Sequence, residues 1–250
     1  MKKMIYFTLL FSLLISNCQK SSSNEIFQVS TIDALLAGVF DGDVSGMNLL
    51  KEGNFGIGTF DDLDGEMIVL NDTIFQVKAD GKVYQPDLEI ETPFASVCNF
   101  KTDTTVTISE TMSLNTTEKR LDKILPNKNL FYAIRIKGDF SYMHTRSVPN
   151  QDKPYPPLKK VTKNQPEFRM DKISGTILGF WCPTYVKGIN VPGYHLHFIS
   201  NERNRGGHIL DFEIVKGQVA IDIIDKFTLQ LPSDNEFGKT DLSQDRSREL

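Results

Sequence analysis

The most informative segment of the sequence is Gly193-Tyr194-His195-Leu196-His197-Phe198-Ile199-Ser200, which is followed, after residues 201–205, by Gly206-Gly207-His208-Ile209-Leu210-Asp211-Phe212. Polar and apolar residues alternate in both halves, and the connection is rich in turn residues. We therefore predict a β-hairpin. Since successive side chains of a strand point to opposite faces, His195 and His197 share one face, about 7 Å apart at Cα.

The register of this hairpin decides where His208 points. An antiparallel pairing that sets His208 opposite His197 or Ile199 places all three imidazoles on one face, and a slip by one residue turns His208 away. The chain has only four His, so this grouping is unusual. We predict the register that brings the three together, with Leu196 and Phe198 anchoring the other face in a core.

Three imidazoles on a rigid hairpin suit Zn²⁺ or another divalent transition metal such as Ni²⁺ or Co²⁺. Three protein ligands leave open coordination positions, which is typical of a catalytic site rather than a closed structural one. The alternative is a hairpin with scattered polar histidines. A cupin-type site is disfavoured, because Ser200 and Asn201 stand where such a site needs Glu.

Strand signals dominate the rest of the chain. Strands are expected over residues 66–70 and 73–77, joined by a turn at Asn71-Asp72, and over 104–109, 130–137, 139–145, 172–180, 207–216 and 218–224, with Gly138 and Gly217 as breaks. Short helices are expected over 30–38, 45–53 and 118–125. The fold class is therefore α+β, strand-rich, with two closely joined mixed-sheet domains and a few short helices.

A Pro-rich stretch, residues 148–160, is the expected joint between these domains, because proline excludes a central strand or a helix. We expect a β-rich N-terminal domain over residues 30–160 and a C-terminal domain with the histidine hairpin over 161–250.

Apolar residues make up 40% and charged residues 24% of the 250, which excludes a disordered chain and a polytopic membrane protein. The net charge of −4 gives no basic surface for nucleic acid.

The N-terminus has the pattern of an export signal. Lys2 and Lys3 precede an apolar run over residues 5–15, which is too short to span a bilayer, and the run ends at Asn17-Cys18. This resembles a bacterial lipoprotein signal (residues 1–18), with residues 19–29 as a tether. We expect a periplasmic or cell-surface lipoprotein whose membrane contact is a lipid anchor on Cys18. Plain secretion is the alternative. Export exposes Cys98 and Cys182 to an oxidising compartment and leaves their pairing open.

Several long motifs resemble the acetolactate decarboxylase family, and together they span residues 30–240. They are Val191-Pro192-Gly193-Tyr194-His195-Leu196-His197-Phe198, Gly206-Gly207-His208, Gly56-Ile57-Gly58-Thr59-Phe60-Asp61-Asp62-Leu63-Asp64-Gly65-Glu66, Gln76-Val77-Lys78-Ala79-Asp80-Gly81, Thr92-Pro93-Phe94-Ala95, Phe131-Tyr132-Ala133-Ile134-Arg135, Thr145-Arg146-Ser147-Val148-Pro149, Lys153-Pro154-Tyr155-Pro156-Pro157-Leu158 and Asn164-Gln165-Pro166.

The resemblance implies a metal-dependent lyase that converts 2-acetolactate to acetoin and CO₂. It implies zinc on His195, His197 and His208, and a pocket that contains Glu66 and Arg146. It also implies a carboxylate from near the C-terminus, for which Glu249 is the candidate. A homodimer is compatible with the sequence, which does not fix the oligomeric state.

The chemistry of this reaction explains the residue types. Loss of CO₂ leaves an electron pair beside a ketone, and a Lewis-acidic metal can stabilise the resulting enediolate. Arg146 would hold the leaving carboxylate by a planar two-point contact, Glu66 would contact the metal or move a proton, and Thr59 would donate its hydroxyl to the substrate. His144 is expected to be half-buried structure, and Asp61, Asp62 and Asp64 a solvated turn.

Two other functions compete with this one. A different zinc enzyme, such as a hydrolase that attacks an ester with metal-bound water, would use the same three histidines. A non-catalytic surface lipoprotein that binds a metal or a small ligand would need no acid or base beside them.

Overall fold

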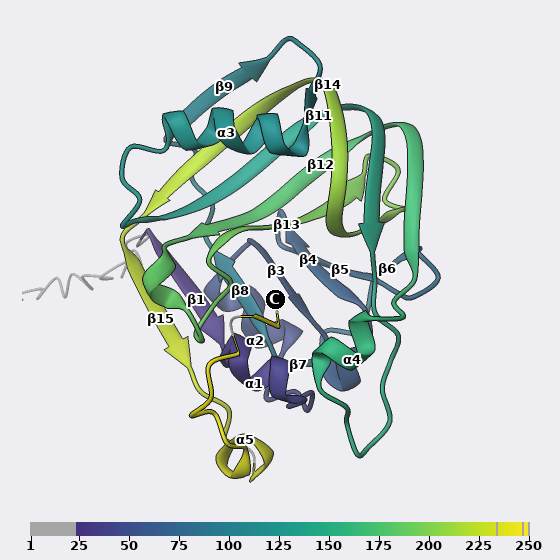
Figure 1. The fold of residues 1–250 in the computed structure, drawn as a ribbon, viewed down its shortest axis with the longest axis vertical. Coiled ribbons are helices and arrows are strands. Elements are labelled where there is room, and N and C mark those ends of the chain that lie inside the picture. Colours follow the sequence, from purple (N-terminus) through teal and green to yellow (C-terminus); the bar gives the residue numbers. More distant parts are fainter. Residues whose placement is uncertain (1–23, 234, 247, 250) are drawn as a thin grey trace, which may run out of the picture.

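The computed structural model describes residues 24–233, 235–246 and 248–249, and within them two β-sheets share an apolar core. The first sheet has the strand order β15-β1-β8-β3-β4-β5-β6. Its strands are β1 (Glu25–Val29), β3 (Phe55–Thr59), β4 (Glu66–Leu70), β5 (Thr73–Val77), β6 (Val83–Tyr84), β8 (Ala95–Cys98) and β15 (Lys226–Gln230). In Figure 1 this sheet forms the lower half of the molecule.

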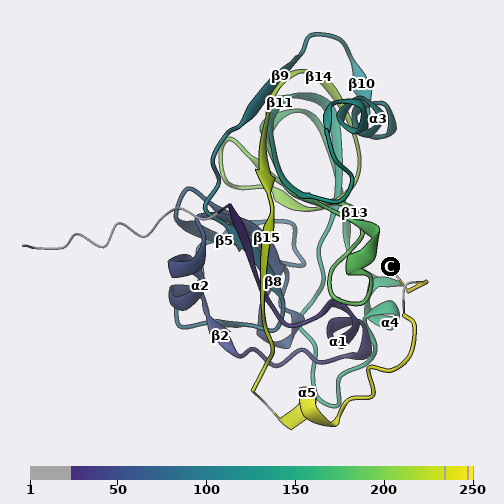
Figure 2. The ribbon, with the colours of Figure 1, turned by 90° about the vertical axis from the view of Figure 1, so that its left-hand side faces the viewer.

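The second sheet curls into a closed, barrel-like layer. Its order is β10-β14-β11-β12-β13, β13 pairs back onto β14, and β9 adds to β14. The strands are β9 (Thr104–Ile108), β10 (Met112–Ser113), β11 (Phe131–Arg146), β12 (Glu167–Cys182), β13 (Gly193–Ser200) and β14 (Gly206–Ile224). Figure 2 shows its rounded cross-section above the first sheet.

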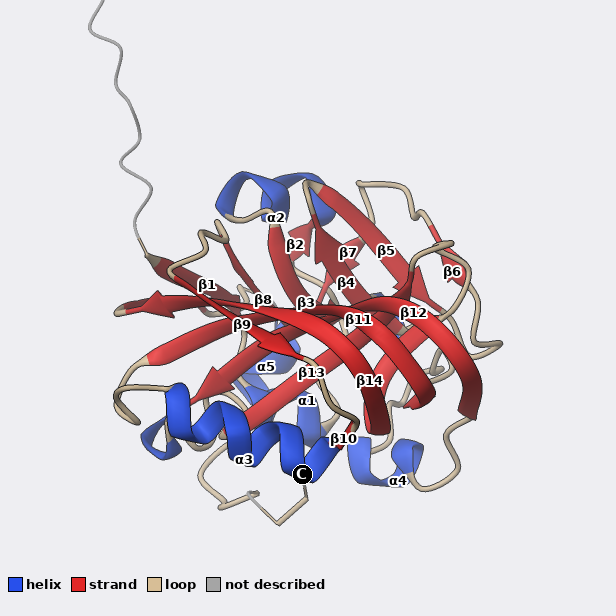
Figure 3. Ribbon diagram, turned by 90° about the horizontal axis from the view of Figure 1, so that it is seen from above, coloured by secondary structure: helices blue, strands red, loops and turns tan. Residues whose placement is uncertain are grey.

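Helices and short elements lie around the strands (Figure 3). The helices are α1 (Ile32–Ala37), α2 (Gly46–Glu52), α3 (Leu114–Ile124), α4 (Leu158–Thr162) and α5 (Asn235–Lys239), with 3-10 turns η1 (Asp61–Leu63) and η2 (Thr184–Val186) and a small pair of strands, β2 (Val44–Ser45) and β7 (Glu91–Thr92). The strand-rich α+β prediction is confirmed. Helices α1 and α2 also begin as predicted, because the side chains of Thr31 and Ser45 cap their first turns.

Alternation along β13 positions the functional face. Leu196 and Phe198 are buried inside the barrel, where the Phe198 ring meets the Phe140 ring edge-on at 5.5 Å. The alternate residues His195, His197 and Ile199 point the other way, toward the first sheet. Ile199 packs there in the core that the two sheets share. The two histidines of β13 therefore face the space between the sheets.

Two predicted breaks are wrong. Gly138 and Gly217 do not end strands, because β11 and β14 each run straight through them. The two glycines lie opposite each other, and Gly138 also faces Gly175 of β12. A Cβ on Gly138 would lie 2.6 Å from the carbonyl oxygen of Lys216. The three paired glycines therefore let β11, β12 and β14 bend at the same position along the sheet. The sequence of one strand cannot predict this, because it does not show which residues lie opposite on the neighbouring strands.

Other boundaries differ from the sequence-based expectation. The residues from Glu25 onward, predicted as tether, form β1 between β8 and β15. Helix α3 begins four residues early, after Ser113 as its cap. A short helix, α4, begins at the end of the Pro-rich stretch. The sheets do not follow a division at residue 160, since β11 belongs with β12–β14 and β15 returns to the first sheet.

The remaining sequence-based expectations concern the cysteines and the N-terminus. Cys98 and Cys182 are buried free thiols, and burial raises the pKa of Cys182 to about 12. The predicted signal segment, residues 1–18, lies outside the described residues. Among the residues that are described, no helix has the length and apolar character needed to cross a bilayer.

Candidate metal centre and substrate cavity

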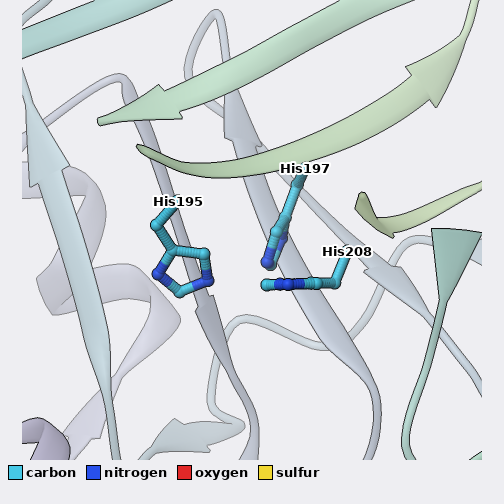
Figure 4. Close-up of side chains that lie close together, drawn as sticks. All are labelled: His195, His197 and His208. Carbon is cyan, nitrogen blue, oxygen red and sulfur yellow. The ribbon is translucent and has the colours of Figure 1, made fainter. Parts of the chain in front are cut away.

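Strands β13 and β14 bring three imidazoles together, as predicted. His197 and His208 are directly opposite in the antiparallel register, and His195 lies two residues before His197 on the same face. The ring centroids are 5.0 Å apart for His195 and His208, and 5.3 Å apart for the other two pairs. Figure 4 shows the rings converging from the two strands on one point.

The local backbone makes this close approach possible. Gly207, beside His208, has φ of +132°, and a Cβ there would lie 2.4 Å from the carbonyl oxygen of Arg146. Any larger residue would push β14 away from β11. Because Arg146 pairs with His208 across these strands, the arginine is held beside the histidine cluster.

Hydrogen bonding and burial leave imidazole nitrogens available. His197 Nδ1 donates to the carbonyl oxygen of Met67 on β4 at 2.9 Å, which leaves Nε2 with the lone pair. Among the described residues, neither His197 Nε2 nor His208 Nδ1 has a hydrogen-bond partner, although both atoms are buried. Burial, and then the charge of Arg146, lowers the pKa of His195 to about 3, and burial also lowers the pKa of the other two.

This donor set fits a divalent metal ion. Each of the three histidines offers one nitrogen, and the three nitrogens lie within 4.8 Å of one another. Buried polar atoms are nearly always paired, so two unpaired imidazole nitrogens at one point indicate a ligand that is itself electron-poor. The carboxylates of three aspartates also lie close enough together to hold a cation, but they already bind Lys153, Tyr155 and the Gly42 amide; these residues are Asp41, Asp61 and Asp62.

Glu66 and Arg146 form a buried ion pair next to the histidines. Arg146 Nη1 donates to Glu66 Oε1 at 3.1 Å, and the two side chains are 17% and 8% exposed. The other oxygen, Glu66 Oε2, lies 3.4 Å from His197 Nε2 without a hydrogen bond. Burial raises the pKa of Glu66, and the positive charge of Arg146 opposes that shift.

A cavity of about 370 Å³ opens beside this cluster. Its polar end contains Glu66, Arg146, His195 and His208, and Glu249 also lines it. The apolar wall consists of residues that largely belong to one hydrophobic cluster, and the lining side chains are those of Ile32, Leu35, Leu36, Leu63, Phe94, Val148, Leu158 and Val191. The cavity therefore combines a charged group of residues with an apolar wall.

The remaining predicted residues are also located. Thr59 lines the cavity, but its hydroxyl donates to the carbonyl oxygen of Gly65 at 2.7 Å, so its proton is already engaged. His144 is half-buried and its Nε2 lies 3.0 Å from Glu167, as expected for a structural residue. Asp64 pairs with Lys78 at 2.7 Å.

Sequence reasoning missed the apolar wall. The sequence predicts a helix over residues 30–38, and nothing in that pattern indicates that Leu35 and Leu36 meet a cavity. Tyr194 also lines the cavity, while its hydroxyl reaches Asp122 on α3 at 3.0 Å. The only available signal for Tyr194 was its place beside His195.

Comparisons with known proteins identify the family of this chain. The family model described as alpha-acetolactate decarboxylase matches residues 26–244. An alpha-acetolactate decarboxylase from Methanosarcina mazei is 46% identical over 237 residues, which is 95% of this chain and 82% of the relative. One from Bacillus subtilis is 42% identical and covers 88% of this chain and 86% of its own length.

Solved structures show the same fold. The crystal structure of alpha-acetolactate decarboxylase from Bacillus subtilis strain 168 superposes with a TM-score of 0.88 at 41% identity, and the match covers 90% of this chain and 97% of that one. A Staphylococcus aureus protein described as similar to alpha-acetolactate decarboxylase gives a TM-score of 0.86 at 33% identity. With a family model spanning most of its length and relatives alike in sequence and fold, this chain belongs to the alpha-acetolactate decarboxylase family, and it is a carboxy-lyase.

Proposed function

We propose that His195, His197 and His208 hold a divalent metal ion, with zinc the first choice, and that the enzyme converts 2-acetolactate to acetoin and CO₂ through an enediolate. Membership of the family supports decarboxylation of acetolactate. The observation that carries the metal assignment is the pair of buried, unpartnered nitrogens, His197 Nε2 and His208 Nδ1, which converge with His195 at the polar end of the cavity.

A divalent ion at these imidazoles would supply a Lewis acid for the electron pair that departing CO₂ leaves behind. The chain's own side chains perform the other tasks. Arg146 uses Nη1 to hold Glu66, and its remaining N–H groups are available for the substrate carboxylate. That contact orients the C–C bond that breaks.

Glu66 and Glu249 are the candidates for moving the proton that ends on the product. Both line the cavity, and burial of Glu66 favours its protonated form relative to an exposed carboxyl. The proton has to reach the carbon that loses CO₂, so the donor must stand beside the substrate and not behind the metal. The apolar wall meanwhile limits the access of water to the carbanionic centre.

The test is an activity assay combined with metal removal. Purified protein without residues 1–18 is given racemic acetolactate, and acetoin is measured before chelation, after chelation and after Zn²⁺ is restored. We expect acetoin release that chelation abolishes and metal restores. Chelator-sensitive ester hydrolysis without acetoin release would favour a hydrolase, and full decarboxylation by metal-free protein would remove the metal from the proposal.

We also propose that the protein is exported and anchored through Cys18. The basic start, the short apolar run and the cysteine support this, and all of them precede the described residues. Several acyl chains on one cysteine hold a protein firmly at a bilayer. Wild-type protein should fractionate with membranes, and Cys18→Ser should release it or stall its processing. A soluble wild-type protein whose N-terminus is not Cys18 would contradict the anchor.

Light scattering on the form lacking residues 1–18 distinguishes a monomer from a homodimer.

A further inference from the structure

Helix α4 lines the cavity and carries a cluster of positive charge. Leu158 and Thr162 on this helix line the cavity, and so does Gln165 just after it. Between and beside these residues stand Lys159, Lys160 and Lys163, all exposed. The same short segment thus faces the cavity with one set of side chains and solvent with three lysines.

These three lysines form no ion pair with any described carboxylate. Lysines elsewhere are commonly neutralised: Lys78 and Lys187 each lie 2.7 Å from a carboxylate oxygen, and Lys128 lies 2.5 Å from one. Glu167, the nearest acidic residue after α4 in the chain, contacts His144 instead. The charge of the three lysines is therefore directed to solvent next to residues that line the cavity.

A second charged group lies on the neighbouring helix α1, which is in contact with α4, and on the C-terminal segment. Glu249 lines the cavity, and Asp33 on α1 is close enough to Asp245, Glu249, Arg246 and Lys187 for their charges to act on it. Lys187 pairs with Asp245, and Arg246 pairs with Glu249. Asp33 is therefore the one negative charge of this group that neither of these two ion pairs neutralises. The three lysines of α4 are therefore an unpaired group of positive charges beside the cavity, on a chain whose net charge is −4, and they attract an approaching anion.

We propose that Lys159, Lys160 and Lys163 form a basic rim that draws the substrate's carboxylate to the cavity and so raises kcat/KM. This inference rests on the proposed function, because it takes the substrate to be a small 2-hydroxy-3-oxo acid anion. The rim acts before the chemical step, whereas the proposed role of Arg146, which lines the cavity, is to hold the same carboxylate inside it. The rim should therefore change KM and leave kcat nearly untouched.

The test replaces all three lysines with Gln and measures steady-state kinetics on acetolactate at low and high salt. Charges are screened beyond about 30 Å at about 10 mM salt, but beyond only a few Å near 1 M. We expect kcat/KM of the variant to be about fivefold below wild type at low salt and within about twofold at high salt, through KM. A triple Lys→Arg variant should keep wild-type values.

A matched control removes the same charge elsewhere. Lys51, Lys137 and Lys172 are also exposed, form no ion pair with a described carboxylate and do not line this cavity. Their triple Gln variant should keep the salt dependence of the wild type. Inhibition by acetoin, the neutral product, should be the same in all variants, since an uncharged ligand does not feel the rim.

Three outcomes would overturn the inference. One is a Gln variant of the rim with wild-type kcat/KM at low salt. Another is an equal loss in the control variant, which would reduce the effect to net charge. The third is rim-dependent binding to vesicles containing phosphatidylglycerol together with unchanged kinetics, which would make the rim a membrane contact. Absence of acetoin production by the wild type would instead refute the proposed function.

Discussion

Arg146 on β11 and Glu66 on β4 join the two sheets through an ion pair of 3.1 Å at the polar end of the cavity. Glu66 is buried and Arg146 is only partly exposed, so each charge depends largely on the other for stabilisation. The hydrogen bond uses Arg146 Nη1, and it fixes the guanidinium plane next to the histidine cluster. The site therefore exists only when both sheets are folded and packed together.

Arg146→Lys should lower kcat/KM at least tenfold, equivalent to about 1.4 kcal/mol of transition-state stabilisation. Lysine keeps the positive charge but cannot hold Glu66 and the substrate carboxylate in one plane. Steady-state kinetics on acetolactate measure the effect. Arg135→Lys is the control, because Arg135 lies on the same strand but stacks over Phe100 outside the cavity. Wild-type kinetics in Arg146→Lys would make this residue a bystander.

Glu249→Gln should lower kcat by about 100-fold if its carboxylate moves the proton, which is the usual scale of general acid–base catalysis. Glu249 lines the cavity, and its Oε1 lies 3.3 Å from Arg246 Nη1. Glu236→Gln on the exposed helix α5 serves as the control. An unchanged kcat in Glu249→Gln would assign the proton transfer to Glu66.

Gly207→Ala should weaken metal binding and lower the melting temperature together. A Cβ at this position would lie 2.4 Å from the Arg146 carbonyl oxygen, on a residue with φ of +132°. The strand has to shift, and it carries His208 away from His197. Elemental analysis and thermal unfolding measure the two effects. Gly238→Ala is the control, since a Cβ there meets nothing within 4 Å.

Asp222→Asn should stabilise the protein above pH 6. Asp222 is 1% exposed, and burial raises its pKa to about 6 from an ordinary value of 3.8. The folded state therefore binds more protons than the unfolded state between these values, and this contribution to stability is lost as pH rises through about 6.

The asparagine variant cannot ionise, so its unfolding free energy should exceed that of the wild type by about 1 to 2 kcal/mol at pH near 7.5 and match it near pH 4. Urea unfolding at both pH values measures the difference. A variant less stable than the wild type at the higher pH would show that the carboxylate's hydrogen bond from the Lys101 amide, at 2.9 Å, outweighs the cost of burying its charge.

The histidine cluster could be predicted from the sequence because its information is local. Strand alternation fixes the shared face of His195 and His197, and a short connection restricts the register that brings in His208. The hairpin of β4 and β5 and the starts of α1 and α2 also depend on local sequence. Each of these predictions is confirmed.

The rest depends on contacts between distant residues. Glu66 and Arg146 are 80 positions apart, and only the family resemblance placed them together. The parallel pairing of β1 with β15 joins Glu25 to Lys226, and no sequence pattern near either strand predicts it. Gly138 and Gly217 resemble strand ends in the sequence, and only the register shows that each is paired with a glycine on a neighbouring strand.

The most direct test of the metal assignment is elemental analysis of purified wild-type protein and of His197→Ala, with circular dichroism on both. His197 Nε2 is buried and unpaired, and the opposite face of β13 supplies the core contacts, so the variant should fold. We predict about one divalent metal ion per chain in the wild type and little in His197→Ala, with His144→Ala like the wild type. Full metal occupancy in a folded His197→Ala protein would contradict the assignment.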